Sequence, residues 1–187
     1  VIGVDIGAFT AHDLWNSNLA FHELSFFPAR DPWSINWGAQ HPDNGVSLHK
    51  ALVKTRLDNS WGDGWAKAGY FQPTGPGTRG VNWSGYPGTY RGAEAGFTRG
   101  GLSVAAAWAD QSKAPWYRDT YHFRRDDGSH VAWLWILGAR YAFDAESPPG
   151  GTTLVLAYGE SHKYLTNGPP QVKNHRQTGD GSLTVGF

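Results

Sequence analysis

The 187-residue chain contains no cysteine and no methionine. Without cysteine it has no disulfide scaffold, no thiol nucleophile and no thiolate zinc site. Its 16 basic and 16 acidic side chains give a formal net charge of zero, which argues against a nucleic-acid-binding surface. The sequence also lacks any run near the roughly 18 consecutive apolar residues of a transmembrane helix, because its longest apolar run, Val131–Leu137, is far shorter.

The motifs of common enzymes are absent as well. There is no G-x-S-x-G and no P-loop, and His22-Glu23 is not followed by a second histidine at helical distance. Asp126 and Asp127 precede Gly128, an arrangement typical of a turn rather than of an acid–base pair. We therefore expect a protein that is not an enzyme, with no catalytic residue, no metal ligand and no cofactor.

What the sequence does have is many aromatic residues (10 Trp, 8 Tyr and 9 Phe) and a regular alternation. Side chains of a β-strand point to opposite faces with a period of two. From Leu102 to Asp110 one face is apolar and the other is made of serine and alanine. From Val131 to Phe143 the odd positions form an apolar and aromatic face. A soluble sandwich would bury such a face in its core, whereas an outer-membrane barrel turns it toward lipid.

The alternation predicts about eight strands in a single domain over residues 1–187. Short turns such as Gly100-Gly101 alternate with long loops such as Ala11–Val46 and Gln111–Ser129, and this asymmetry is typical of outer-membrane barrels. We therefore predict an all-β fold, a transmembrane antiparallel up-and-down β-barrel that is partial. The expected strands are Val1–Thr10, Ser47–Asn59, Trp65–Gln72, Tyr90–Arg99, Leu102–Asp110, His130–Asp144, Thr152–His162 and Ser182–Phe187.

If the apolar face meets lipid, the opposite face lines the inside. A charge on the lipid face costs about 2–4 kcal/mol at mid-membrane, so the charged residues fix which side faces in. The residues predicted to face lipid are Ala51, Val53, Leu57, Ala66, Ala68, Tyr70, Phe97, Val104, Trp108, Trp133, Trp135 and Tyr141. The residues predicted to face the lumen, with Asp5, are Lys50, Lys54, Arg56, Trp65, Lys67, Glu94 and Arg140.

Several motifs together resemble the OprD-type outer-membrane porins, and within them the chitoporin branch. They are Asp5–Thr10, Ala68–Gly75, Pro87–Gly96, Lys113–Trp116 and Leu137–Tyr141. The resemblance implies a monomeric channel of about 18 antiparallel strands in the bacterial outer membrane, narrowed by inward-folded loops. It implies passive uptake of small solutes, chito-oligosaccharides in the chitoporin branch and amino acids or small peptides in others. Its partners would be membrane lipid and the solute, with no nucleic acid.

The chain departs from that family in length, since eight strands are under half of the family's number. Eight strands alone close around their own side chains and leave no aqueous channel. Because the first residue is Val1 rather than methionine, we interpret the chain as a partial segment of a longer protein. The terminal Phe187 has two interpretations, either the aromatic used by the assembly machinery or a strand cut part-way.

Two functional questions stay open at the level of sequence. Trp83 and Trp116 lie in loops that the family folds toward the pore, and either contact sugar there or only pack the loops against the wall. The tryptophan content favours oligosaccharides, whereas the row of cations favours carboxylate-bearing solutes. A soluble, Trp-rich carbohydrate-binding β-domain is the alternative from another class, and detergent dependence distinguishes it from a porin.

Overall fold

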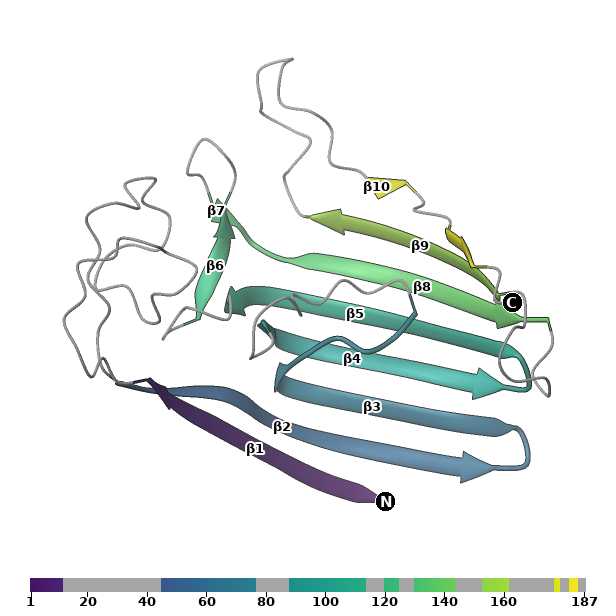
Figure 1. The fold of residues 1–187 in the computed structure, drawn as a ribbon, viewed down its shortest axis with the longest axis horizontal. Coiled ribbons are helices and arrows are strands. Elements are labelled where there is room, and N and C mark those ends of the chain that lie inside the picture. The colour runs from purple at the N-terminus through teal and green to yellow at the C-terminus, as the bar shows by residue number, and fades with distance from the viewer. Residues whose placement is uncertain are drawn as a thin grey trace, which may run out of the picture.

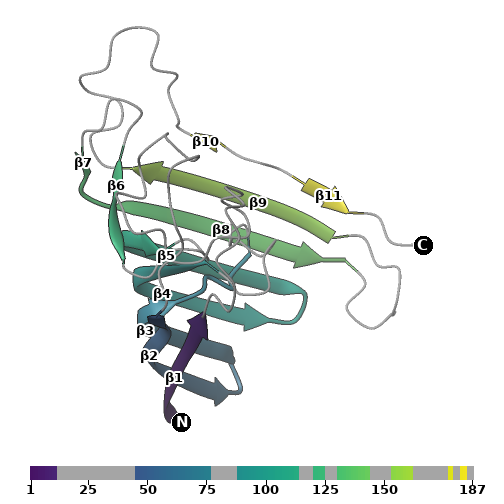
Figure 2. The same ribbon diagram turned by 60° about the vertical axis from the view of Figure 1, so that its left-hand side comes forward.

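A computed structural model describes residues 1–11, 45–76, 88–113, 120–124, 130–143, 153–161, 177–178 and 182–184. Neighbouring strands run antiparallel in one sheet that does not close, in the order β1-β2-β3-β4-β5-β8-β9-β10 (Figures 1 and 2). The strands are β1 (Ile2–Ala11), β2 (Gly45–Asn59), β3 (Gly62–Phe71), β4 (Thr89–Arg99), β5 (Leu102–Lys113), β6 (Tyr121–Arg124), β7 (His130–Val131), β8 (Leu134–Ala142), β9 (Thr153–Ser161), β10 (Gln177–Thr178) and β11 (Ser182–Thr184).

The predicted all-β, up-and-down antiparallel arrangement is confirmed, and the open sheet is consistent with part of a barrel. Sequence neighbours β1 to β5 pair in order, and β8 and β9 continue the sheet. Within the described residues, no helix is long and apolar enough to cross a membrane.

The strand registers divide the side chains between two faces. One ladder of directly opposed residues, called the outer face here, runs Val53, Ala68, Ala93, Trp108, Trp135. The next ladder, on the inner face, runs Lys54, Lys67, Glu94, Ala107, Ile136. Because the ladders keep the same parity across five strands, apolar and charged residues separate as the alternation predicts.

Tight turns join the strands at one end of the sheet. Ser60 and Trp61 connect β2 to β3, and Gly100 and Gly101 connect β4 to β5. Gly100 has a φ of +56°, a conformation that suits a two-residue hairpin. The Gly100-Gly101 turn was predicted from the sequence and is confirmed.

Two β-bulges lie at the other end of the strands. The β1–β2 register shifts between Gly7 and Ala8, which leaves His49 unopposed between Leu48 and Lys50. The β4–β5 register shifts between Arg91 and Gly92, which leaves Asp110 unopposed. An extra residue in one strand shifts the alternation of side chains by one position, so two adjacent side chains can point to the same face of the sheet. Neither bulge was predicted.

The chain leaves the plane of the sheet directly after β3. Residues 72–76, called the inner segment here, cross in front of β4 and β5 (Figure 1), on the face that carries Glu94. An ideal Cβ on Gly75 would lie 2.3 Å from the Cβ of Ala105, so the backbone rests directly on β5. Phe71, the last residue of β3, is fully buried. Glu94, which contacts the inner segment, is also among the largest fully buried side chains.

The structure corrects the single strand expected over His130–Asp144. β8 pairs with β5 from Leu102 to Ala109, whereas β6 pairs with the same edge of β5 at Gln111 and Ser112. Because β7 pairs with β6, the chain must step from that hairpin back to β5 before β8 begins. Val131, predicted to face outward, is consequently buried. Trp133, also predicted to face outward, lies in the short connection between β7 and β8.

Two expected loops also contain strand. β5 continues to Lys113, and β6 lies within the loop expected over Gln111–Ser129. β10 lies between the expected strands Thr152–His162 and Ser182–Phe187, where the alternation predicted no strand. These short pairings depend on a neighbouring strand edge and not on local alternation.

Candidate functional site

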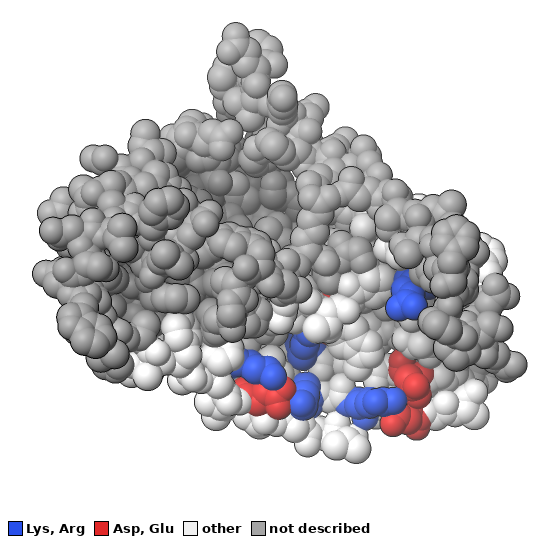
Figure 3. Space-filling view, in the orientation of Figure 1, with Lys and Arg blue, Asp and Glu red and all other residues white. Residues whose placement is uncertain are grey.

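Charged side chains gather on the inner face over β1, β2 and β3 (Figure 3). Lys50 and Lys54, four residues apart on β2, both reach the carboxylate of Asp5 on β1. Their Nζ atoms lie 3.0 Å and 2.9 Å from its oxygens. One anion therefore neutralises only half of the charge of the two lysines.

The bulge at His49 shapes a hollow beside this cluster. Because the bulge reverses parity, His49 and Lys50 both turn inward although they are adjacent in sequence. The hollow has a volume of about 350 Å³ and opens on the inner face. Its lining residues are Asp5, His49, Lys50, Leu52, Lys54, Lys67, Gln72, Thr74 and Thr89. We take this hollow as the candidate site, because basic, amide and hydroxyl groups converge there.

A second group of inner residues lies nearer the short turns. Arg56 contacts the carboxylates of Asp58 at 2.6 Å and Asp63 at 3.5 Å. Next to it, the ring of Trp65 lies over Gly96, where an added Cβ would be 2.5 Å from the ring carbons. The absence of a side chain at position 96 thus allows the indole to lie against the wall of the sheet.

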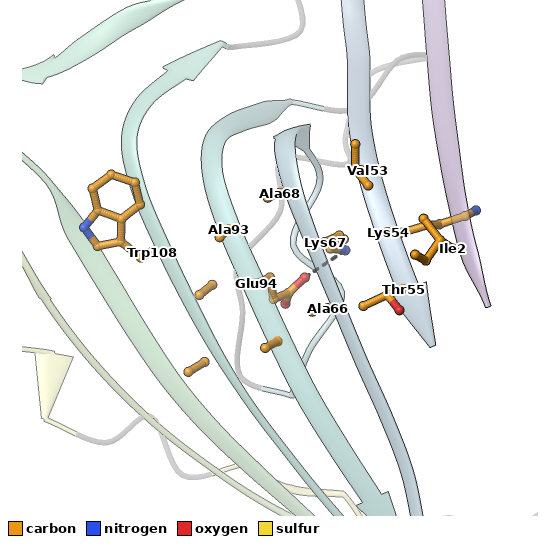
Figure 4. Close-up of a pocket in the computed structure, with 13 residues that line it drawn as sticks. Ile2, Val53, Lys54, Thr55, Ala66, Lys67, Ala68, Ala93, Glu94 and Trp108 are labelled. Atoms are coloured by element: carbon orange, nitrogen blue, oxygen red, sulfur yellow. Dashed lines mark ion pairs between the residues drawn. The ribbon is translucent and has the colours of Figure 1, made fainter. Parts of the chain in front are cut away.

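Lys67 and Glu94 form the most buried ion pair among the described residues, with side chains 12% and 0% exposed. Their charged atoms are 2.8 Å apart, and the two side chains lie side by side on β3 and β4 (Figure 4). The Lys67 ammonium also lies 5.4 Å and 5.3 Å from the ring centres of Trp65 and Phe71. Both ions also bond to the inner segment.

The inner charges are therefore largely paired. The sequence predicts a row of five cations with fewer anions, but Lys50, Lys54, Arg56 and Lys67 each contact a carboxylate. Among the described residues only Arg140 of that set forms no ion pair. The geometry therefore gives a polar wall with a small excess of positive charge.

The outer face is apolar between two polar rims. On β4 the outward residues Ala93, Ala95 and Phe97 lie between Arg91 and Arg99, and Arg91 forms a bidentate pair with Asp110 of β5. Alanines of β3, β4 and β5 also leave an apolar hollow of about 630 Å³ on this face, beside Val53, Ile2 and Trp108 (Figure 4).

On the inner parity of their strands lie all of the predicted lumen residues Lys50, Lys54, Arg56, Trp65, Lys67, Glu94 and Arg140. Trp83 and Trp116 lie outside the described residues. In the described part of the chain, no group of three or more histidine, aspartate or glutamate side chains is placed to hold a metal ion. Sequence reasoning missed His49 and the inner segment, since both depend on where the chain bulges or leaves the sheet.

Comparison with known proteins identifies a curated relative of this chain. No protein-family model matches the chain. The chain is similar to chitoporin of Escherichia coli (strain K12). The two are 34% identical over 173 residues, which is 88% of this chain and 35% of chitoporin. The chain thus spans about a third of the length of the curated relative that it matches. The match supports a relationship to porins, whereas membership of the OprD-type family stays a prediction.

Proposed function

We propose that the chain forms part of the wall of a channel in the bacterial outer membrane, through which small polar solutes pass without a catalytic step. The observation that carries the proposal is the separation of an apolar outer face from a charged inner face across five paired strands. A sheet in a bilayer needs this separation, because lipid surrounds one face and water fills the other. The similarity to chitoporin supports the same interpretation.

Oligosaccharides are the solutes that the inner face favours. Sugar rings present apolar C–H faces, and the indole of Trp65 lies against the wall as a flat partner for them. Carboxylates already engage Lys50, Lys54 and Lys67, so the described wall offers hydrogen-bonding groups without a strong net charge. We propose chito-oligosaccharides as the specific substrate. Trp83 and Trp116 are proposed as further contacts for the sugar.

A second candidate is a channel for amino acids or small peptides. Lys50 and Lys54 share one carboxylate, and Arg140 has no ion pair within the described part of the chain. A solute carboxylate would add a second anion to this group. The observation favours acidic or zwitterionic solutes over neutral sugars.

The experiment is a planar-bilayer recording of the full-length protein. We expect chito-oligosaccharides to block the current, and maltosugars to block it less. Equal block by every sugar together with strong block by acidic or zwitterionic amino acids would assign the channel to the second candidate. A protein that stays monodisperse without detergent and carries no current would instead be a soluble carbohydrate-binding module.

We further propose a monomeric pore that contacts membrane lipid.

A further inference from the structure

The inner segment is bonded to the wall by both members of one buried ion pair. Lys67 donates to the carbonyl oxygen of Gln72 at 2.7 Å and to the hydroxyl of Thr74 at 2.8 Å, besides its contact with Glu94. An ammonium group has three hydrogen atoms to donate. Lys67 therefore uses all of its donors within this group.

Glu94 fixes the same segment from the neighbouring strand. Its carboxylate accepts from the amide of Gly75 at 2.7 Å and from the amide of Thr74 at 3.1 Å. Buried carboxylates need such partners, because an unpaired charge away from water is costly. The pair consequently bonds to four groups of the inner segment: one backbone carbonyl, one side-chain hydroxyl and two adjacent backbone amides.

The packing beneath the segment leaves it no room to shift toward the wall. The backbone at Gly75 rests on Ala105 of β5, and Ala105 is only 3% exposed. On its other side, the segment contributes Gln72 and Thr74 to the hollow that also contains Lys50 and Lys54. The position of the segment therefore sets one boundary of the candidate site.

We propose that Lys67 and Glu94 are positioning residues that hold residues 72–76 as a fixed narrowing of the lumen, and that they do not bind the solute. This inference rests on the proposed channel function. It gives these two residues, predicted only to face the lumen, a structural role, because their polar atoms are already engaged by each other and by the segment. It also assigns solute contact at this level to the other side of the segment, where Lys50 and Lys54 are more than 40% exposed.

The test uses single-channel recordings of the full-length protein with Lys67→Met and Lys54→Met. Both variants remove one positive charge from the inner face, but only Lys67 bonds to the inner segment. We expect Lys67→Met to increase open-channel noise and to admit larger polyethylene glycols, whereas Lys54→Met leaves the size of the largest admitted polymer unchanged. Glu94→Gln keeps an acceptor oxygen for the amides and should give a smaller effect than Lys67→Met. Equal effects of Lys67→Met and Lys54→Met on the size of the largest admitted polymer would overturn the proposal.

A second readout does not depend on channel current. Ala105→Cys places a thiol under the inner segment, and Ala107→Cys gives a second buried position. The 187 residues contain no cysteine, and any cysteine elsewhere in the full-length protein is first replaced by serine. Releasing the segment should speed labelling by a membrane-impermeant maleimide more than about tenfold, because loss of one partner of a buried ion pair is strongly destabilising. We expect this increase with Lys67→Met and not with Lys54→Met.

The two readouts separate the two proposals. If the wild-type protein carries no current but the Lys67→Met variant still exposes the thiol to labelling, the channel proposal is disproved and the positioning role is retained. A normal current with unchanged labelling in Lys67→Met would disprove the positioning role alone. Unheated gel electrophoresis of each variant checks that the sheet has folded before either result is counted.

Discussion

An arginine introduced in the middle of the outer face measures whether that face meets lipid. Ala95 of β4 lies four residues from each of Arg91 and Arg99, and its neighbours in the adjacent strands are Ala66 and Ala106. All of these outward neighbours are small and apolar. Ala95→Arg therefore adds a charge without removing a packed side chain.

The expected cost follows from the distance to the rims. Eight residues at about 3.4 Å each separate Arg91 from Arg99 by about 27 Å along the strand. With a strand tilt of about 40°, the height is about 21 Å, close to the apolar band of about 25 Å in outer-membrane barrels. Ala95 then lies about 10 Å from either rim, where an arginine costs about 2–4 kcal/mol. At an exposed position of a soluble sheet the same change costs within about 0.5 kcal/mol.

The assay is equilibrium unfolding of the full-length protein in lipid vesicles. Ala93→Arg is the matched control, because position 93 lies only two residues from Arg91 and a long side chain there reaches the polar rim. Ala157→Arg, on the inner parity of β9, controls for a charge in contact with water. We expect a loss of free energy of unfolding that is largest for Ala95→Arg. Losses below about 0.5 kcal/mol for all three variants would refute the assignment of the outer face to lipid.

Three further changes test the inner face and the turns. Trp65→Ala should weaken the block by chito-oligosaccharides about fivefold, since a stacked ring contributes about 1 kcal/mol, and Trp61→Ala in the exposed turn should leave the block unchanged in the same recordings. Lys54→Gln should shift the reversal potential in a salt gradient toward cations, because wall charges set ion selectivity; an unchanged potential would place Lys54 outside the conduction path. Gly62→Ala should cost roughly 3 kcal/mol of unfolding free energy, since φ is +141° and the ring of Phe97 lies 2.5 Å from an added Cβ. At Gly100, with a φ of +56° and nothing within 4 Å, Gly→Ala should cost only about 1 kcal/mol.

The sequence was sufficient to predict most of the long strands and which of their residues share a face. Between Leu102 and Trp108 the period of two is uninterrupted, and the structure places those even positions on the outer face. The two-residue turn at Gly100 was predicted for the same reason, because paired glycines satisfy a local backbone requirement. Both features depend only on residues close together in the chain.

What the sequence did not predict depends on distant residues. The bulge at His49 is defined against β1, which lies more than 30 residues earlier. The break before Leu134 arises because β6 and β8 share one edge of β5. For the candidate site, the structure places Glu94 on the same face as Lys67, as the alternation predicted, but its contact with the amides of the inner segment was not predicted. A lysine and a glutamate at facing positions, next to a segment rich in proline and glycine, were the only sequence signal for that contact.

The edge formed by β1 has a consequence for handling this polypeptide. β1 pairs with β2 along its whole length, and its other edge has no partner within the described part of the chain. Ile2, Val4 and Ile6 remain more than 60% exposed there. An unpaired, apolar strand edge recruits further strands, so a preparation of these 187 residues alone should assemble edge to edge. Ligand binding measured on such assemblies would report on a stacked-strand surface, and solution studies therefore require a protein in which that edge is covered.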